Sequence, residues 1–304
     1  MKKEIKEIAA STRARLLNIA KLENIDFDFL LLRYFQERFL YRLSISDYSQ
    51  NFILKGGLLL VYLDIPKSRP TIDIDLLARR IKSNSDNVKN VICKIAEISC
   101  NDGVKFYPAS AITEIIKKNT DYTGIRIKIN ASLEQAKKSL KFDISFGDII
   151  IPKAIKIEFP TLLDESSPQI MVYSIESIVA EKFEAMDKLA IINSRIKDFY
   201  DIYMLSISQN FKSDTLKKAI ELTFLKRKTI LPENPTIFES EFHNNKEKQQ
   251  QWMAFLRKTK IKEITYNFNE VMERITKLLK PIVITGQDKT IEEKTWAPID
   301  GIWR

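Results

Sequence analysis

The chain has 304 residues, 44% of them hydrophobic, which is typical of a globular protein with one large core or two modest domains. Its formal net charge of +9, from 49 Lys and Arg against 40 Asp and Glu, favours polyanionic partners such as nucleic acid or nucleotides. One histidine, His243 in a polar segment that we expect to be exposed, argues against a Ser/His/Asp triad or a histidine metal site, so chemistry should use carboxylates, lysines and metal ions.

The first half of the chain mixes helical and strand patterns. Apolar residues at spacings of three and four predict helices over 12–24 and 27–46, and Gly56 and Gly57 open a short helical segment that runs to about Leu63. Residues 71–79 alternate like a half-buried strand, a helical pattern returns over 85–100, and strict alternation predicts two more strands over 123–133 and 140–150.

Past Pro168 we expect the strands to stop and helices to dominate, beginning after Ser174 as a plausible N-cap. The tail from Thr285 onward is turn-rich. The predicted fold class is therefore α+β, with a mixed-sheet domain over 1–168, which includes the N-terminal helices, and a mainly helical domain over 169–304.

No membrane or export segment is expected. The longest apolar stretch, around Leu58 to Leu63, is far shorter than the roughly 20 residues that a bilayer requires. The N-terminus also carries charges where a signal peptide needs an apolar core. We therefore expect a cytoplasmic protein.

Two aspartates separated by one isoleucine follow the glycine pair. Because side chains alternate along a strand, Asp73 and Asp75 should share one face while Ile72, Ile74 and Leu76 face the core. Two adjacent carboxylates repel each other unless a cation lies between them, and Mg²⁺ held by carboxylates and phosphate oxygens is the usual solution. An exposed edge strand with solvated acids is the alternative.

A third carboxylate comes from the strand over 140–150, where Asp143 lies on the polar face. Together with Asp73 and Asp75 it would complete a set able to hold two metal ions for an in-line phosphoryl displacement, and Asp143 could take the proton of the attacking hydroxyl. Asp148 is a weaker candidate for the same position because it lies off the Asp143 face. Sequence alone does not decide between the two.

The glycine pair would allow close backbone approach to a phosphate. Gly56 and Gly57 are the predicted phosphate-binding residues, with Lys55 beside them, although a plain strand-to-helix turn would need the same glycines.

Lys182 lies on the apolar face of its predicted helix. Either its stem reaches past the core to water, or its ammonium meets a phosphate or a carboxylate in an inter-domain cleft. In the next helix Asp198 and Asp201 share a face with Arg195. They could form surface salt bridges, or they could provide a cleft-facing acid opposite Lys182.

These residues resemble the nucleotidyltransferase AbiEii/AbiGii toxin family of type IV toxin–antitoxin systems. The resemblance follows the family's order through the segments RYFQERFLYRLSISDYSQNFILKGG, RPTIDIDLL, FDISFGD, EKFEAM, RIKDFYDIY, FLKRKTILP and QQWMAFL. It implies a polymerase-β-like nucleotidyltransferase domain, a helical domain, and NTP with Mg²⁺ bound between them. Gly56 and Gly57 match the phosphate-holding motif, Asp73 and Asp75 the metal-binding pair, Lys182 the lysine and Asp198 the acid of the family; Asp143 matches less securely.

The resemblance implies transfer of NMP from an NTP to an RNA acceptor, with the tRNA 3′ end expected, and a separately encoded cognate antitoxin. The +9 charge suits an RNA substrate. Three alternatives stay open at this point: a nucleotidyltransferase acting on protein or a small molecule, a non-catalytic nucleotide- or RNA-binding module, and a structural partner protein. The identity of the NTP and the oligomeric state are not predicted.

Overall fold

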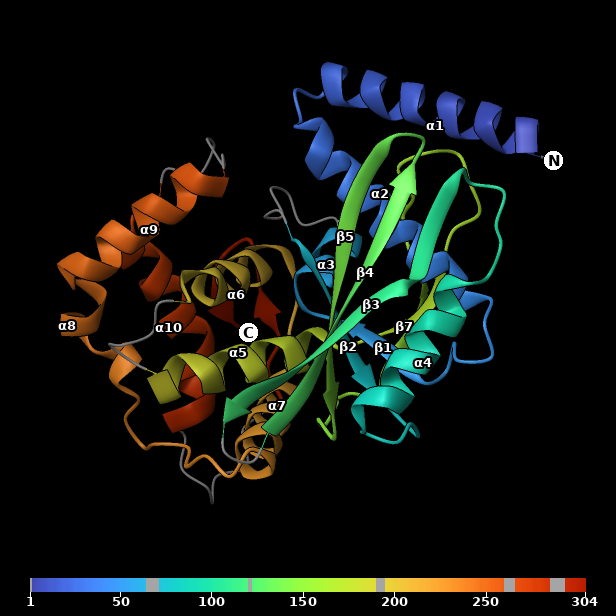
Figure 1. Ribbon diagram of the computed structural model, residues 1–304. Coiled ribbons are helices and arrows are strands. Elements are labelled where there is room, and N and C mark those ends of the chain that lie inside the picture. Colours follow the sequence, from blue (N-terminus) through green and yellow to red (C-terminus); the bar gives the residue numbers. More distant parts are fainter. Residues whose placement is uncertain (1, 64–70, 120–121, 190–194, 260–265, 285–292) are drawn as a thin grey trace. The chain divides into compact units, whose positions relative to one another are not determined.

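The structure is a computed structural model that describes residues 2–63, 71–119, 122–189, 195–259, 266–284 and 293–304 (Figure 1). Two compact units divide the chain. The described parts of Met1–Tyr62, Pro70–Gly147 and Ile155–Val172 form the first unit, and Asp148–Ala154 and Tyr173–Arg304 belong to the second. Within the described ranges no helix combines the length and the apolar composition that crossing a membrane requires.

The first unit is built on a seven-stranded mixed sheet with the strand order β3-β4-β5-β2-β1-β7-β6. The β5–β2 and β1–β7 pairs are parallel and the other pairs are antiparallel. Figure 1 shows β3, β4 and β5 running side by side. The strands are β1 (Phe52–Lys55), β2 (Asp73–Ala78), β3 (Val104–Asn119), β4 (Tyr122–Leu133), β5 (Ala136–Phe146), β6 (Ile155–Glu158) and β7 (Gln169–Val172). Its helices are α1 (Lys2–Leu22), α2 (Phe27–Ser44), α3 (Gly56–Tyr62) and α4 (Ser85–Ala96).

One face of this sheet is apolar and forms the core with α2 and α4. Phe39 of α2 packs against Phe142 of β5 and Phe106 of β3, with ring centroids 4.4 and 5.9 Å apart. Val88 and Ile92 of α4 are fully buried, which matches the helical spacing of the sequence. The polar side chains of the same strands are therefore left on the opposite face.

The second unit is mainly helical. Phe199 of α6 contacts Phe268 of α10 at 5.4 Å between ring centroids, and Trp252 of α9 is fully buried. The helices are α5 (Ile175–Leu189), α6 (Ile196–Ser208), α7 (Ser213–Lys226), the 3₁₀ turn η2 (Thr236–Phe238), α8 (Ser240–His243), α9 (Lys246–Thr259) and α10 (Phe268–Ile284). The hydroxyl of Ser174 accepts a hydrogen bond from the Ser177 amide at 3.2 Å, which confirms its capping role.

The expectation that strands stop at Pro168 is wrong. β7 follows that proline directly, and β8 (Trp296–Ala297) pairs with β9 (Ile302–Trp303) near the C-terminus. The hairpin is held by tryptophan: Trp296 donates to the Ser206 carbonyl at 2.7 Å, and Trp303 to the Leu278 carbonyl at 3.1 Å. Strands of two to four residues carry too little alternation to be distinguished from turns.

His243 is also not exposed, contrary to expectation. Its relative exposure is 7%, and its Nε2 lies 2.9 Å from the Ile237 carbonyl oxygen. Burial lowers the pKa of its imidazole, although the hydrogen bond to the Ile237 carbonyl acts in the opposite direction. The apolar neighbour Phe242, which packs on Phe199 and Phe268, brings the histidine inward with the short helix α8.

α2 carries a buried acid whose titration should be visible in stability. Glu37 is fully buried, and its Oε2 accepts from the Leu162 amide at 2.7 Å, while Arg38 lies 3.2 Å from Oε1. Burial, opposed by Arg38, raises the pKa of Glu37 from 4.5 to about 7. Because the folded state then holds a proton that the unfolded state has released, the stability that this proton provides is present below pH 4.5 and is lost as the pH rises through about 7.

We expect this to show in a Glu37→Gln variant, which cannot ionise but keeps an acceptor for Leu162. Relative to the wild type, the variant should gain up to about 3 kcal/mol of unfolding free energy between pH 4.5 and 8. Urea unfolding at several pH values measures the difference. A difference that stays constant across this range would show that Glu37 does not titrate there.

Candidate active site

The glycine bend lies against one of the predicted metal-binding acids. β1 ends at Lys55 and α3 begins at Gly56, whose φ of +70° lies in the left-handed region. A Cβ atom on Gly56 would lie 2.1 Å from Oδ2 of Asp75, so no other residue fits. The β1–β2 register places Lys55, which is 8% exposed, opposite Asp75. Glycine is thus required here both by the backbone and by the carboxylate.

Replacing Gly56 with alanine should therefore be costly. Positive φ and the overlap with Asp75 together should lower the unfolding free energy by about 1–3 kcal/mol, and Asp75 must move. Thermal unfolding measures the loss. Gly57→Ala is the control for stability, since Gly57 lies inside α3 without a positive φ. Equal melting temperatures for the two variants would contradict the requirement at position 56.

β2 presents its two acids on one face, as predicted. Ile74 and Leu76 are fully buried on the other face, whereas Asp73 and Asp75 are only half-buried. Nζ of Lys141 lies 3.0 Å from Oδ1 of Asp73, and this buried oxygen makes no hydrogen bond. A metal ion bound by Asp73 would take the place of the Lys141 ammonium as the positive charge beside this carboxylate.

Ile72 does not face the core, contrary to expectation. It lies just before β2 and is 58% exposed. Its carbonyl oxygen accepts a hydrogen bond from Gln36 at 3.1 Å. The alternation that the sequence predicts for this strand therefore holds only from Asp73 to Leu76, because Leu77 and Ala78 are also buried.

Asp143 of β5 is the acid that the sheet places beside this pair. The parallel β2–β5 register sets Asp143 next to Asp75 and Lys141 next to Asp73. Asp148 lies past the end of β5, belongs to the second unit, and has Arg227 at 3.9 Å. On the sheet itself, Asp143 is the acid that lies next to Asp75 in the register.

An arginine that the sequence analysis did not select holds Asp143. Nε and Nη2 of Arg126, in β4, each donate to one of its carboxylate oxygens at 2.7 Å. This bidentate hydrogen bonding raises the pKa of the Arg126 guanidinium. The alternation of TGIRIKI, which places Arg126 on the polar face next to Asp143, was the signal that could have identified it.

The carboxylates on the sheet suit Mg²⁺ that is bound together with a nucleotide. Mg²⁺ is usually bound by one or two carboxylates plus phosphate oxygens and water, and Asp73 and Asp75 supply two carboxylates on one face. Among the described residues no group of three or more acidic, cysteine or histidine side chains forms a complete protein cage. Both oxygens of Asp143 are engaged by Arg126, so Asp143 would have to share or exchange this partner to bind a metal.

In the second unit, Lys182 of α5 meets two carboxylates of α6. Its Nζ lies 2.9 Å from Oδ1 of Asp198 and 2.7 Å from Oδ2 of Asp201. Both aspartates are buried, at 1% and 0% exposure, so these are not surface salt bridges. Arg195 adds a contact of 3.1 Å to Oδ2 of Asp198. Lys182 therefore places its ammonium in a buried acidic pair, not in bulk water.

The charges around Asp198 favour its ionised form. Burial alone would raise the pKa of Asp198, but Lys182 and Arg195 outweigh it and lower the pKa below the usual value. Asp198 Oδ2 is buried and makes no hydrogen bond, and its charge is balanced by Arg195 at 3.1 Å. Asp201, which the sequence places one helical turn after Asp198, contacts the lysine at the shorter distance.

A second charged network joins α5 to the segment that follows α7. Nη1 of Arg227 donates to Glu184 at 2.7 Å, and Nη2 lies 3.1 Å from Glu181. Burial would lower the pKa of Arg227, but these carboxylates raise it. Thr229 also donates to Glu184 at 2.7 Å. Sequence analysis found no role for this arginine; the network fixes α5 against the segment that follows α7.

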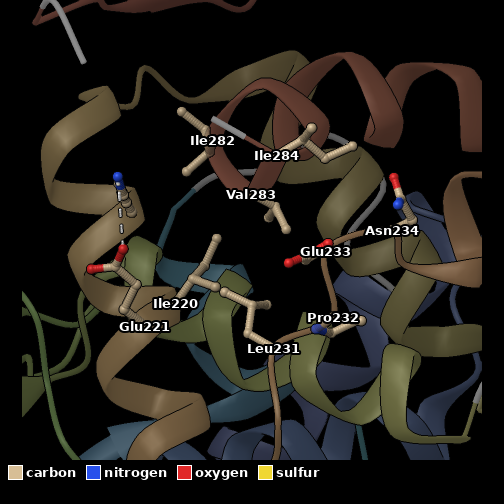
Figure 2. A pocket seen from close by; sticks show the side chains of 10 residues that line it. Ile220, Glu221, Leu231, Pro232, Glu233, Asn234, Ile282, Val283 and Ile284 are labelled. Carbon is tan, nitrogen blue, oxygen red and sulfur yellow. Dashed lines mark ion pairs between the residues drawn. The ribbon is translucent and has the colours of Figure 1, made fainter. Parts of the chain in front are cut away.

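The second unit also contains a cavity of about 610 Å³ that is lined by both apolar and polar side chains, shown in Figure 2. Ile220 of α7, Leu231 and Val283 of α10 point toward one another in its interior, while Glu221 and Lys217 form an ion pair of 3.8 Å at its side. None of its lining residues is among the predicted site residues.

Comparison with known proteins gives one family and two structures. The family model described as the nucleotidyl transferase AbiEii toxin of type IV toxin–antitoxin systems matches residues 38–274. Among curated proteins, none matches the chain. The chain is similar to the crystal structure of JHP933 from Helicobacter pylori (15% identity, TM-score 0.43), which covers 81% of this chain and 88% of that one. It is also similar to a candidate nucleotidyltransferase from H. pylori (16% identity, TM-score 0.40, 81% and 90% covered).

Proposed function

Since the chain belongs to the AbiEii nucleotidyl transferase toxin family of type IV toxin–antitoxin systems, we propose that it transfers NMP from an NTP to an RNA acceptor, the tRNA 3′ end, and thereby inhibits translation and growth. The family makes it a nucleotidyltransferase toxin with a nucleotide substrate and an antitoxin partner. The observation that carries the proposal is the placement of Asp73, Asp75 and Asp143 side by side on one sheet face, next to a glycine bend. We expect the protein to act in the cytoplasm.

The reaction that these residues would support is an in-line displacement at the α-phosphorus. The acceptor hydroxyl oxygen forms a bond to the α-phosphorus, the bond to the β-phosphate bridging oxygen breaks, and pyrophosphate leaves with that electron pair. Asp73 and Asp75 would hold Mg²⁺. When bound, the ion neutralises phosphate charge and favours ionisation of the acceptor hydroxyl. Asp143, beside Asp75 in the register, accepts the hydroxyl proton.

The remaining residues bind and orient the triphosphate. Backbone amides of Gly56 and Gly57 can approach phosphate oxygens closely, because neither residue carries a side chain. Lys182, which Asp198 and Asp201 hold, is expected from the family resemblance to supply a positive charge for the phosphates. Lys55 adds a further cation at the end of β1.

Labelled NTPs incubated with the protein, Mg²⁺, and either total tRNA or total cell protein test the proposal. Label should enter the tRNA pool, and it should require both Mg²⁺ and an intact 3′ hydroxyl. Label in the protein pool would identify a protein nucleotidyltransferase instead. Binding of NTP without transfer to either pool would favour a binding module that acts by sequestration.

A further inference from the structure

The polar face of the sheet continues well beyond the acids. β4 and β5 pair in antiparallel register, so residues of the two strands stand opposite each other in successive rungs on this face. Starting at Asp143, every second residue of β5 meets every second residue of β4. The rungs are Arg126 with Asp143, Lys128 with Lys141, Asn130 with Ser139, and Ser132 with Lys137.

Near the acids, each cation of this face is neutralised. Arg126 is bound by Asp143, and Lys141 lies 3.0 Å from Asp73. Lys128 donates to Glu114 of β3 at 2.5 Å. This end of the face therefore has positive and negative charges in alternation, and it offers no net attraction for a polyanion by itself.

The other end of the face differs in charge and in shape. It forms an open cavity of about 550 Å³ whose lining contains no carboxylate. Of its two lysines, Lys138 is paired with Asp28 at 2.6 Å, whereas Lys137 is exposed and lines the cavity together with hydroxyl and amide groups. The lining residues are Tyr107, Ala109, Ser110, Asn130, Lys137, Lys138 and Ser139. Lysine ammonium, serine hydroxyl and asparagine amide groups are the side chains that contact phosphate oxygens.

The wall of this cavity is preformed. The Ser110 hydroxyl donates to the Tyr107 carbonyl at 2.6 Å and accepts from the Asn130 amide at 2.9 Å. The Tyr107 hydroxyl lies 2.9 Å from the hydroxyl of Ser132, and Nζ of Lys105 lies 5.1 Å from the Tyr107 ring centroid. A second exposed cation, Lys105, is thereby added beside the cavity.

The spacing along β5 suits a strand of nucleotides. Ser139 and Lys137 lie four and six residues from Asp143, which corresponds to about 13 and 20 Å at the ~3.3 Å rise per strand residue. At the ~3.4 Å rise of stacked nucleotides, these distances are about four and six nucleotides. A chain bound in the cavity would thus reach the acids with its end.

We propose that this cavity binds the phosphate backbone of the acceptor RNA a few nucleotides from its 3′ end, with Lys137 and Lys105 as the main cationic contacts. The inference rests on the proposed function, because it assigns the same site its acceptor-binding surface. The lysines and the arginine next to the acids are neutralised, whereas Lys105 and Lys137 are exposed at the cavity. The RNA backbone would therefore bind at the cavity, and the acids would remain available for the metal ion and the triphosphate.

Binding of a fluorescent single-stranded RNA to the full-length protein, in EDTA and without NTP, separates this inference from catalysis. The Lys105→Glu/Lys137→Glu variant should bind at least about tenfold more weakly, and its slope of log affinity against log salt should fall by about 1 for each lost phosphate contact. The control is Lys94→Glu, which reverses the charge of an exposed lysine on α4. It is compared with the single variant Lys137→Glu. The control should retain wild-type affinity, whereas Lys137→Glu should not.

Equal affinity for Lys137→Glu and Lys94→Glu would overturn the inference, whether both match the wild type or both are weakened. The inference would also fail in a competition experiment if polyglutamate, ATP or inorganic phosphate displaced the fluorescent RNA as effectively as unlabelled RNA does. The competitors are compared at equal concentrations of phosphate or carboxylate groups. Label transfer distinguishes the two proposals. If the double variant transfers label normally at an unchanged KM for RNA, the acceptor surface is refuted and the proposed function is not. If the wild-type protein binds RNA here but transfers no label, the proposed function is refuted and the acceptor surface is not.

Discussion

Replacing Asp73 and Asp75 together with asparagine should abolish nucleotide transfer while leaving the sheet intact. Asparagine preserves the shape of both side chains, but it removes the two negative charges on which a divalent cation depends. A catalytic metal contributes several kcal/mol, so transfer should fall by about 10³-fold or more. Release of pyrophosphate in the presence of RNA measures the loss. Expression of the variant should also no longer inhibit growth.

The control for this variant is Asp164→Asn, an exposed acid in the same unit. It should keep full activity. Retention of transfer within about tenfold by the double variant would show that these acids do not hold a catalytic cation. Unchanged toxicity together with lost transfer would instead assign growth inhibition to binding.

Replacing Lys182 with methionine should lower both the unfolding free energy and the rate of nucleotide transfer. Methionine keeps the apolar stem, but it leaves Asp198 and Asp201 buried without their ammonium partner. Removing one member of a buried ion pair costs about 3–5 kcal/mol. If Lys182 also neutralises phosphate charge, transfer should fall by about 10²–10³-fold at a temperature where the variant is folded. Lys218→Met, an exposed lysine in the same unit, should change neither quantity.

A triple variant separates the two roles of this lysine. Lys182→Met combined with Asp198→Asn and Asp201→Asn removes the uncompensated charges, so most of the lost unfolding free energy should return. Transfer should not return, because the cation is still absent. Recovery of transfer together with stability would mean that the cluster is structural and that Lys182 does not act on the phosphates.

The longer elements of the fold could be predicted from periodicity. α2, α4 and α5 follow the spacing of their apolar residues, and β4 carries the alternation TGIRIKI on which its prediction rested. β3, with sixteen residues, was missed because its two halves are offset by an irregularity between Tyr107 and Ile112, which breaks the alternation. The short β1, β6 and β7 are defined by their neighbours in the sheet, and no local pattern specifies them.

The types of residue in the site could be predicted from the sequence, but the contacts between their side chains could not. Alternation places Asp73 and Asp75 on one face, and helical spacing places Lys182 on an apolar face, so both features could be identified without coordinates. That Arg126 holds Asp143, and that Asp201 contacts Lys182, depends on the register of β4 and on the packing of α5 against α6. Such contacts join residues that lie far apart in the sequence, and single-sequence reasoning has no access to them.

The measurement that tests the central claim most directly is mass analysis of tRNA 3′ ends after incubation with the protein, Mg²⁺ and each NTP in turn. The account predicts a gain of one or more nucleotide monophosphates at the 3′ end with at least one NTP, and no gain with the Asp73→Asn/Asp75→Asn variant. Unchanged 3′ ends with all four NTPs would contradict it.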